Sequence, residues 1–387
     1  MRRTDVHTKR ALQTNSSVCS VLFVLFSAVY LYFLQPFLLA QEQHFFSHGR
    51  TTYDGFLGAF LITAILTFLG LFLHRMLRLP SYFQAVAWMP SCYILGLLSS
   101  LHFPHFASDA HSAPLFLLIA FPLLFVLLLY VSKSFPDTSH NRTNQRSALA
   151  LNITQLFLMF LCVGTLGNCS SRFHAELRAA NFSYHARHQD ALKVAANSPD
   201  VTHYLSAVRA YSLSAEGQLG DRLFHYPQIP SSKSLLLHPN DTLHAIDITD
   251  KIYKHLGYYP LFQYSFSPKH FLTHAVQKDT LSNSPAIEYL LSAYLLDAEL
   301  PSFAKLLFEK KDTTSVLSIA THYKEALLLY EHQTAEADSF AFINDSIRMA
   351  YSDFLYTKDS LQNRMSTLEN CKRKYGKTYW FYYYFVH

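Results

Sequence analysis

Long apolar runs dominate the first part of the chain and stop near residue 168. Five runs of roughly 18 residues or more contain no charged side chain, which is the length a helix needs to cross the hydrocarbon core of a bilayer. They cover residues 18–40, 55–73, 82–101, 113–131 and 148–167. Gln84, Asn152 and Gln155 dilute two of them, and hydrogen bonding between helices is the role expected for such residues. Residues 1–168 are therefore predicted to form a five-helix transmembrane bundle.

Basic residues beside these runs predict an orientation. Short cytoplasmic loops of membrane proteins collect Lys and Arg. Nine of the ten basic residues in the first 168 positions fall on one side of the predicted spans, namely Arg2, Arg3, Lys9, Arg10, Arg75, Arg78, Lys133, Arg142 and Arg146. Arg50 is the exception. Five spans with a cytoplasmic N-terminus place residues 169–387 outside the cytoplasm.

From residue 169 onward the pattern changes to apolar residues at helical spacing, broken by Pro, Gly and short polar clusters. The clearest unit is a helix hairpin in PAIEYLLSAYLLDAELPSFAKLLFEKK, with Pro301 placed to open the second helix. Further helices are expected near residues 185–197, 201–215, 242–256, 315–332 and 338–356. Successive antiparallel pairs suggest an irregular tetratricopeptide-like array without a regular 34-residue period. The predicted fold class is all-α.

Charge and motifs exclude several functions. The first 168 residues carry 10 Lys and Arg against 5 Asp and Glu, whereas the remaining residues carry 22 against 22. The second part thus has no excess of positive charge to attract nucleic acid. No nucleophile elbow, Walker loop, dinucleotide fingerprint or HExxH motif occurs, and no cofactor is expected. The charge-free spans also argue against ion-coupled transport.

The predicted outer loops hold the main chemical candidates. Glu42 in the first loop is a candidate catalytic acid or base at the membrane surface, or a solvated loop carboxylate. His44 and His48 are four residues apart, and His102 and His105 in the second loop are three apart. On a helical turn these spacings bring imidazoles together as zinc ligands do. Because the chain contains 21 histidines, chance pairing is the competing interpretation.

Two features of the second part stay open at this point. Cys169 and Cys371 are candidates for a disulfide if both lie in an oxidising compartment, and free thiols are the alternative. The chain ends in CKRKYGKTYWFYYYFVH, where four basic residues precede a run of aromatic ones. This tail is predicted either to dock against the last helices or to lie at a lipid headgroup surface.

Four segments together resemble a known family: LLAQEQHFF, SLSAEGQLGDRLFHYPQ, HYKEALLLYE and GKTYWFYYYF. The chain is similar to uncharacterised bacterial multi-pass membrane proteins that combine a helical membrane region with a tetratricopeptide-like C-terminal region. It departs from them in lacking a Pro-Gly-Gly where TTYDGFLG stands. The resemblance implies a bacterial inner membrane and a periplasmic domain, and it implies no particular chemistry.

These observations favour a membrane-anchored scaffold over an enzyme. The expected role is a periplasmic helical-repeat domain that binds an envelope protein, with the lipid bilayer as the other partner. The alternative is a membrane-surface enzyme, similar to glycosyltransferases that use lipid-linked sugars, with Glu42 and the outer-loop histidines in its active site. Nucleic acid is not an expected partner.

Overall fold

The computed structural model describes the chain in eleven stretches, and all regular structure in them is helical. The described residues are 2–100, 115–134, 142–167, 170–238, 248–259, 267–278, 284–310, 319–334, 340, 343–360 and 364–387. Two compact units divide the chain. The first contains residues 1–174 with 243–245, and the second contains residues 175–242 and 246–387.

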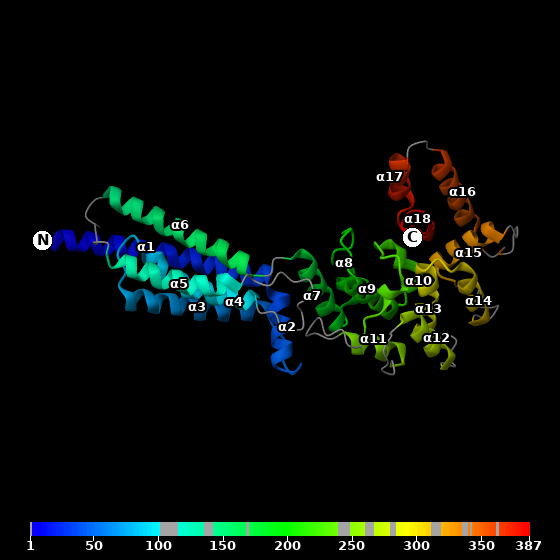
Figure 1. Cartoon of the computed structure of the whole chain (residues 1–387), viewed down its shortest axis with the longest axis horizontal. Coiled ribbons are helices and arrows are strands. Elements are labelled where there is room, and N and C mark those ends of the chain that lie inside the picture. Colours follow the sequence, from blue (N-terminus) through cyan, green and yellow to red (C-terminus); the bar gives the residue numbers. More distant parts are fainter. Residues whose placement is uncertain are drawn as a thin grey trace. The chain divides into compact units, whose positions relative to one another are not determined.

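The first unit is a bundle of long helices. Its elements are α1 (Arg2–Val29), the π-helical η1 (Tyr30–Leu34), α2 (Pro36–Phe46), α3 (Gly55–Leu77), the 3₁₀-helical η2 (Gln84–Trp88), α4 (Met89–Ser100), α5 (Leu115–Ser132) and α6 (Arg142–Leu166). In Figure 1, α1 and α3 to α6 run lengthwise beside one another, whereas α2 is turned across one end of the bundle. Helix α2 is thus the one long element of this unit, within its described part, that does not follow the bundle axis.

The five-span prediction is corrected by the helix lengths. Three described helical stretches are long and apolar enough to cross a membrane: Asn15–Leu34, Gly55–Leu77 and Gln145–Leu166. The third predicted span, 82–101, does not form one helix, because η2 and α4 divide it. The fourth, 113–131, overlaps α5 (Leu115–Ser132), which contains a shorter apolar stretch over Ile119–Ser132, and the first two residues of this predicted span lie outside the described part of the chain.

A buried asparagine explains why the third predicted span is interrupted. The Asn152 side chain accepts a hydrogen bond from the Ala85 amide at 2.8 Å and donates to the Ser81 carbonyl at 2.7 Å. These bonds satisfy backbone groups just before and inside η2 and hold this segment against α6. The interhelical role predicted for Asn152 is confirmed, and the same contact prevents a straight helix from 82 onward.

The outer surface of the bundle is apolar. Phe56, Phe60 and Phe68 on α3 are 71%, 61% and 73% exposed. Large apolar residues are similarly exposed along α1, α5 and α6. The described part of the second unit exposes fewer large apolar residues, two of which are Met349 and Tyr356 on α16. Water-soluble surfaces rarely expose so much contiguous apolar area, so this surface is suited to lipid.

The second unit is an array of shorter helices. It contains most of α7 (Ser171–Tyr184), then α8 (His188–Lys193), α9 (His203–Ala215), α10 (Leu219–Arg222), η4 (Leu223–His225), η5 (Ser232–Leu235), α11 (Thr249–Leu256), α12 (Pro268–Lys278), α13 (Pro285–Leu296), α14 (Leu300–Lys310), α15 (Thr321–Thr334), α16 (Asp345–Ser360), α17 (Arg364–Tyr375) and α18 (Tyr379–Phe385). Consecutive helices from α12 to α17 pack on one another. One apolar core runs through the unit.

The predicted helix hairpin is confirmed. Helix α13 begins at Pro285, where the Ser284 hydroxyl caps the Ala286 amide, and α14 contains Pro301 in its first turn. Between them Ala298 adopts a left-handed backbone conformation with φ of 52°. The other predicted helices correspond to α8, α9, α11, α15 and α16, with shifted ends. Nothing in these contacts establishes a tetratricopeptide repeat.

The aromatic tail docks onto its own unit. Helix α18 folds back onto α15, and Tyr379, Trp380, Phe381 and Tyr382 are buried. The Tyr379 and Tyr382 hydroxyls donate to the carbonyls of Leu295 and Leu296, at 3.2 and 2.7 Å. These carbonyls belong to the last turn of α13, where backbone acceptors lack partners within the helix. The tail therefore completes the end of α13.

Candidate functional site

The predicted catalytic candidate Glu42 is a buried residue of α2. The chain leaves α1 through the π-helical turn η1, bends at Gln35 and restarts as α2 with Pro36 in its first position. Gln35, Leu38, Leu39 and Glu42 are all buried, and positions 35, 38, 39 and 42 share one face of a helix. Glu42 therefore lies on the buried face of α2 and is not a solvated loop carboxylate.

Glu42 lacks a compensating charge among the described residues. It is 7% exposed, and its Oε1 atom has no hydrogen-bond partner in that part of the chain. Burial raises the pKa of Glu42 to about 8. Burial, followed by the charges of Asp54 and Glu42, raises the pKa of the nearby Tyr53 hydroxyl to about 12. A carboxyl whose pKa lies near neutrality can act as a general acid or base.

The first-loop histidines do not join Glu42. His44 is two positions further along α2, and therefore faces away from Glu42, and its ring lies against Gly49. His48 is exposed, in a turn after α2 with a φ of 50°. No group of three or more His, Cys, Asp or Glu side chains converges as a metal site anywhere in the described residues. His102 and His105 lie outside the described residues, so their proposed role stays a prediction.

The predicted Cys169–Cys371 disulfide also stays a prediction. Cys169 lies outside the described residues. Cys371 is buried in α17 within the apolar core of the second unit. A small apolar residue in a helix contact is thus the role that the structure describes for Cys371.

A second polar cluster lies inside the helical array, and it is not among the sites predicted from the sequence. The Oε2 atom of Glu325 is 2.9 Å from Nδ1 of His322 and accepts the Tyr379 amide at 2.7 Å. Glu325 and His322 are 6% and 1% exposed. The ring of His225, from η4, stands 5.4 Å from the His322 ring, centroid to centroid. The cluster joins α15, η4 and the first residue of α18.

Helix α18 is fixed at its N-terminus by this cluster. The Tyr379 amide is an N-terminal helix donor with no partner within α18, and an anionic acceptor there is favourable. The Trp380 indole also donates to the Glu325 carbonyl at 2.9 Å. Glu325 thus contacts the tail through both its side chain and its backbone. The signal in the sequence is the HYKE segment, where His322 and Glu325 share a helical face three residues apart.

We expect His225 to make the second unit sensitive to acid. Burial, followed by the charges of His322, Lys377 and Arg222, lowers the pKa of His225 from 6.5 to about 4 against an opposing effect of Asp221. The unfolded chain binds this proton more readily, so the stabilisation is complete above about pH 6.5 and is lost as the pH falls toward 4. Because His225 is partly exposed, we expect a loss of about 1–2 kcal/mol.

The measurement is the free energy of unfolding of the second unit between pH 7.5 and pH 4, for the wild-type chain and His225→Gln. The glutamine variant should show the shallower dependence. His188 and His255, whose pKa values are also lowered by burial, contribute equally to both curves. Identical slopes for the two proteins would contradict the role given to His225.

Comparisons with known proteins identify a family and no activity. The chain matches a family of unknown function, DUF6057, over residues 82–265 and 261–386. Neither the curated proteins nor the solved structures contain a match to it. The two matched stretches include α4 to α6 and nearly all of the helical array, which is well over half of the sequence. The chain belongs to the family of unknown function DUF6057.

Proposed function

We propose that this protein is an integral membrane protein of the bacterial inner membrane whose helical array acts as a periplasmic scaffold for another envelope protein. The observation that carries the proposal is the contrast between the two surfaces. Phenylalanine side chains on α3 are more than half exposed, and the array has an apolar core of its own beneath a mostly polar surface. Such a bundle needs lipid around it, and such an array needs water.

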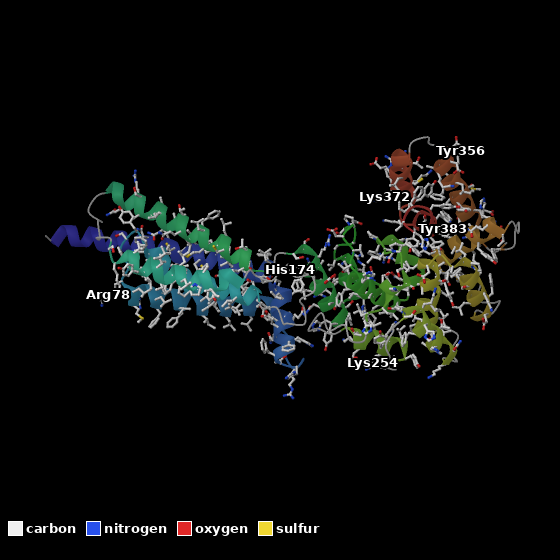
Figure 2. The ribbon with its side chains drawn as sticks, viewed as in Figure 1. Arg78, His174, Lys254, Tyr356, Lys372 and Tyr383 are labelled. Atoms are coloured by element: carbon white, nitrogen blue, oxygen red, sulfur yellow. The ribbon has the colours of Figure 1, made fainter. Side chains whose placement is uncertain are left out.

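Charge supports a cytoplasmic N-terminus. Arg78, at the end of α3, lies at the same end of the bundle as the N-terminus, opposite the end crossed by α2 (Figure 2). Lys and Arg collected at one end of a membrane bundle favour its cytoplasmic placement. Three spans and five spans give the same topology, because α4 and α5 would add a pair of spans. With a cytoplasmic N-terminus, either count supports a periplasmic array.

Alkaline phosphatase fusions test the orientation, because this enzyme is active only outside the cytoplasm. A fusion after His387 should be active and a fusion after Arg78 should be inactive. Sodium carbonate at high pH should leave the full chain in the membrane fraction. Inverted fusion activities would overturn the orientation, and release by carbonate would overturn membrane insertion.

A photoreactive amino acid tests the scaffold role in intact cells. We would place it at Tyr356, which is 75% exposed on α16, and at Phe68, which is 73% exposed on α3. The Tyr356 position should give one protein adduct of reproducible mass, and the Phe68 position should give lipid adducts. If Tyr356 yields no protein adduct, and other exposed positions of α12 to α17 also yield none, the scaffold role is wrong.

The buried state of Glu42 favours one second candidate, an enzyme acting on a lipid-linked or envelope substrate at the membrane surface. A buried carboxyl without a partner costs stability, and such a cost is typical of catalytic groups. We expect Glu42→Gln to abolish complementation of a deletion strain at normal protein level if this candidate is correct. Full complementation by Glu42→Gln would exclude the enzyme and leave the scaffold as the remaining candidate.

A further inference from the structure

Helix α12 carries two exposed histidines one turn apart. His270 and His274 occupy positions i and i+4, and their ring centroids are 4.5 Å apart with an interplanar angle of 83°. Both side chains are exposed to solvent. Neither ring makes a hydrogen bond or ion pair with any residue that the structure describes. Their nitrogen lone pairs are therefore available to a ligand.

The backbone beneath the pair is well anchored. The opposite face of α12 buries Phe271, Leu272, Ala275 and Val276 in the core of the unit. Lys269, next to His270, forms an ion pair with Asp297 at 3.0 Å. The two imidazoles therefore project from a helix whose rotation is fixed by packing. Little backbone order remains to be gained when a ligand binds, which lowers the cost of binding.

Simple geometry indicates what such a pair holds. A metal–nitrogen bond of about 2.0–2.1 Å puts the metal roughly 3.2 Å from each ring centroid. Two rings bound at a right angle then have centroids about 4.5 Å apart, whereas a tetrahedral angle requires about 5.2 Å. The observed 4.5 Å shows that the two exposed rings are close enough for both to reach one ion after a small rotation about their side-chain bonds. Imidazole nitrogens of this kind bind Cu²⁺, Ni²⁺ and Zn²⁺.

We propose that His270 and His274 bind a divalent transition-metal ion, with Cu²⁺ the strongest binder and water completing its coordination. The two lysines of α12 are directed elsewhere: Lys269 pairs with Asp297, and Lys278 Nζ lies 3.3 Å from the Tyr258 hydroxyl and 5.0 Å from the centre of that ring. Copper also exceeds nickel and zinc in affinity for imidazole at most sites. The ion joins two turns of α12 and stabilises the folded unit by mass action.

The same spacing at His44 and His48 does not produce this arrangement. There the His44 ring lies against Gly49, and His48 belongs to a left-handed turn beyond the end of α2. A spacing of four residues brings imidazoles together only when both residues lie on one continuous helix. His270 and His274 meet that condition inside α12, which runs from Pro268 to Lys278.

Copper titration of the full-length protein in detergent tests the proposal. The protein is purified through a tag without histidine, and bound Cu²⁺ is followed by electron paramagnetic resonance and by calorimetry. We expect His270→Gln and His274→Gln each to lose one bound equivalent and its nitrogen hyperfine signal. His203→Gln, which removes a single exposed histidine at the start of α9, should retain that equivalent.

Circular dichroism and the unfolding midpoint without metal establish that the variants fold. Exposed positions make normal folding the expected result for all three. Cu²⁺ should raise the unfolding midpoint of the wild-type chain and of His203→Gln, and should leave the α12 variants unchanged. Equal copper stoichiometry and equal spectra in the wild type and both α12 variants would overturn the proposal.

Discussion

Glu325→Ala should destabilise the second unit by about 3 kcal/mol. The substitution removes the carboxylate that accepts from His322 and from the Tyr379 amide, and both donors are buried. Buried donors without an acceptor bear their full cost of dehydration. The destabilisation affects the start of α18 directly, because the Tyr379 amide loses its acceptor. This helix should therefore detach before the rest of the unit unfolds. The measurement is denaturant unfolding followed by Trp380 fluorescence in a Trp88→Phe background, because the chain has only two tryptophans.

The matched control is Glu309→Ala, which removes an exposed carboxylate from α14. Its free energy of unfolding should stay within about 0.5 kcal/mol of the wild type. Glu325→Gln should lie between the two, since its amide oxygen can still accept one of the hydrogen bonds. If Glu325→Ala unfolds at the same denaturant concentration as Glu309→Ala, then Glu325 does not anchor α18.

Much of the fold could be predicted from periodicity and charge. The hairpin of α13 and α14 follows from its apolar stripes, Ser284 and Pro301, all of them local signals. The side of the predicted spans on which the basic residues collect also follows from their positions in the sequence alone. The interruption near Gln84 could not be predicted in the same way. It depends on Asn152, which lies 67 positions after the Ala85 amide that it binds.

The candidate sites show the same limit. Glu42 could be selected because it is an acidic residue beside a predicted span, whereas its burial depends on α2 turning across the bundle. His322 and Glu325 are visible as a local pair in HYKE. Their link to Tyr379 spans 54 positions, which no local pattern reveals. The pair of His270 and His274 required knowing that α12 is one unbroken helix with that face exposed.

Helix α18 covers part of the apolar core of the array. Solenoid-like arrays need terminal elements that cover the core of the last repeat. Here α18 is that element, because its aromatic rings cover α13 and α15 and its hydroxyls satisfy the last carbonyls of α13. Tyr383, labelled in Figure 2, adds an acceptor for the Gln333 amide at 2.9 Å. The run of aromatic residues is thus used for packing.

Trp380→Ala should be the most destabilising single substitution considered, at about 3–5 kcal/mol. Trp380 is 1% exposed, its ring contacts Tyr351 and Phe354, and its indole donates to the Glu325 carbonyl. Alanine leaves a large cavity and removes the hydrogen bond of the indole. Hydrogen exchange measured by mass spectrometry should show faster exchange in α18 and α16 and unchanged exchange in α9.

Tyr356→Ala is the matched control, because it removes an aromatic ring that is 75% exposed on α16. We expect it to change the stability by about 0.5 kcal/mol or less. Brominated lipids distinguish packing from membrane contact, since bromine quenches indole fluorescence only at short range. In a Trp88→Phe background, the brominated lipids should not quench the fluorescence of Trp380. Strong quenching, together with a small effect of Trp380→Ala on stability, would place the tail at the lipid surface and not in the core of the array.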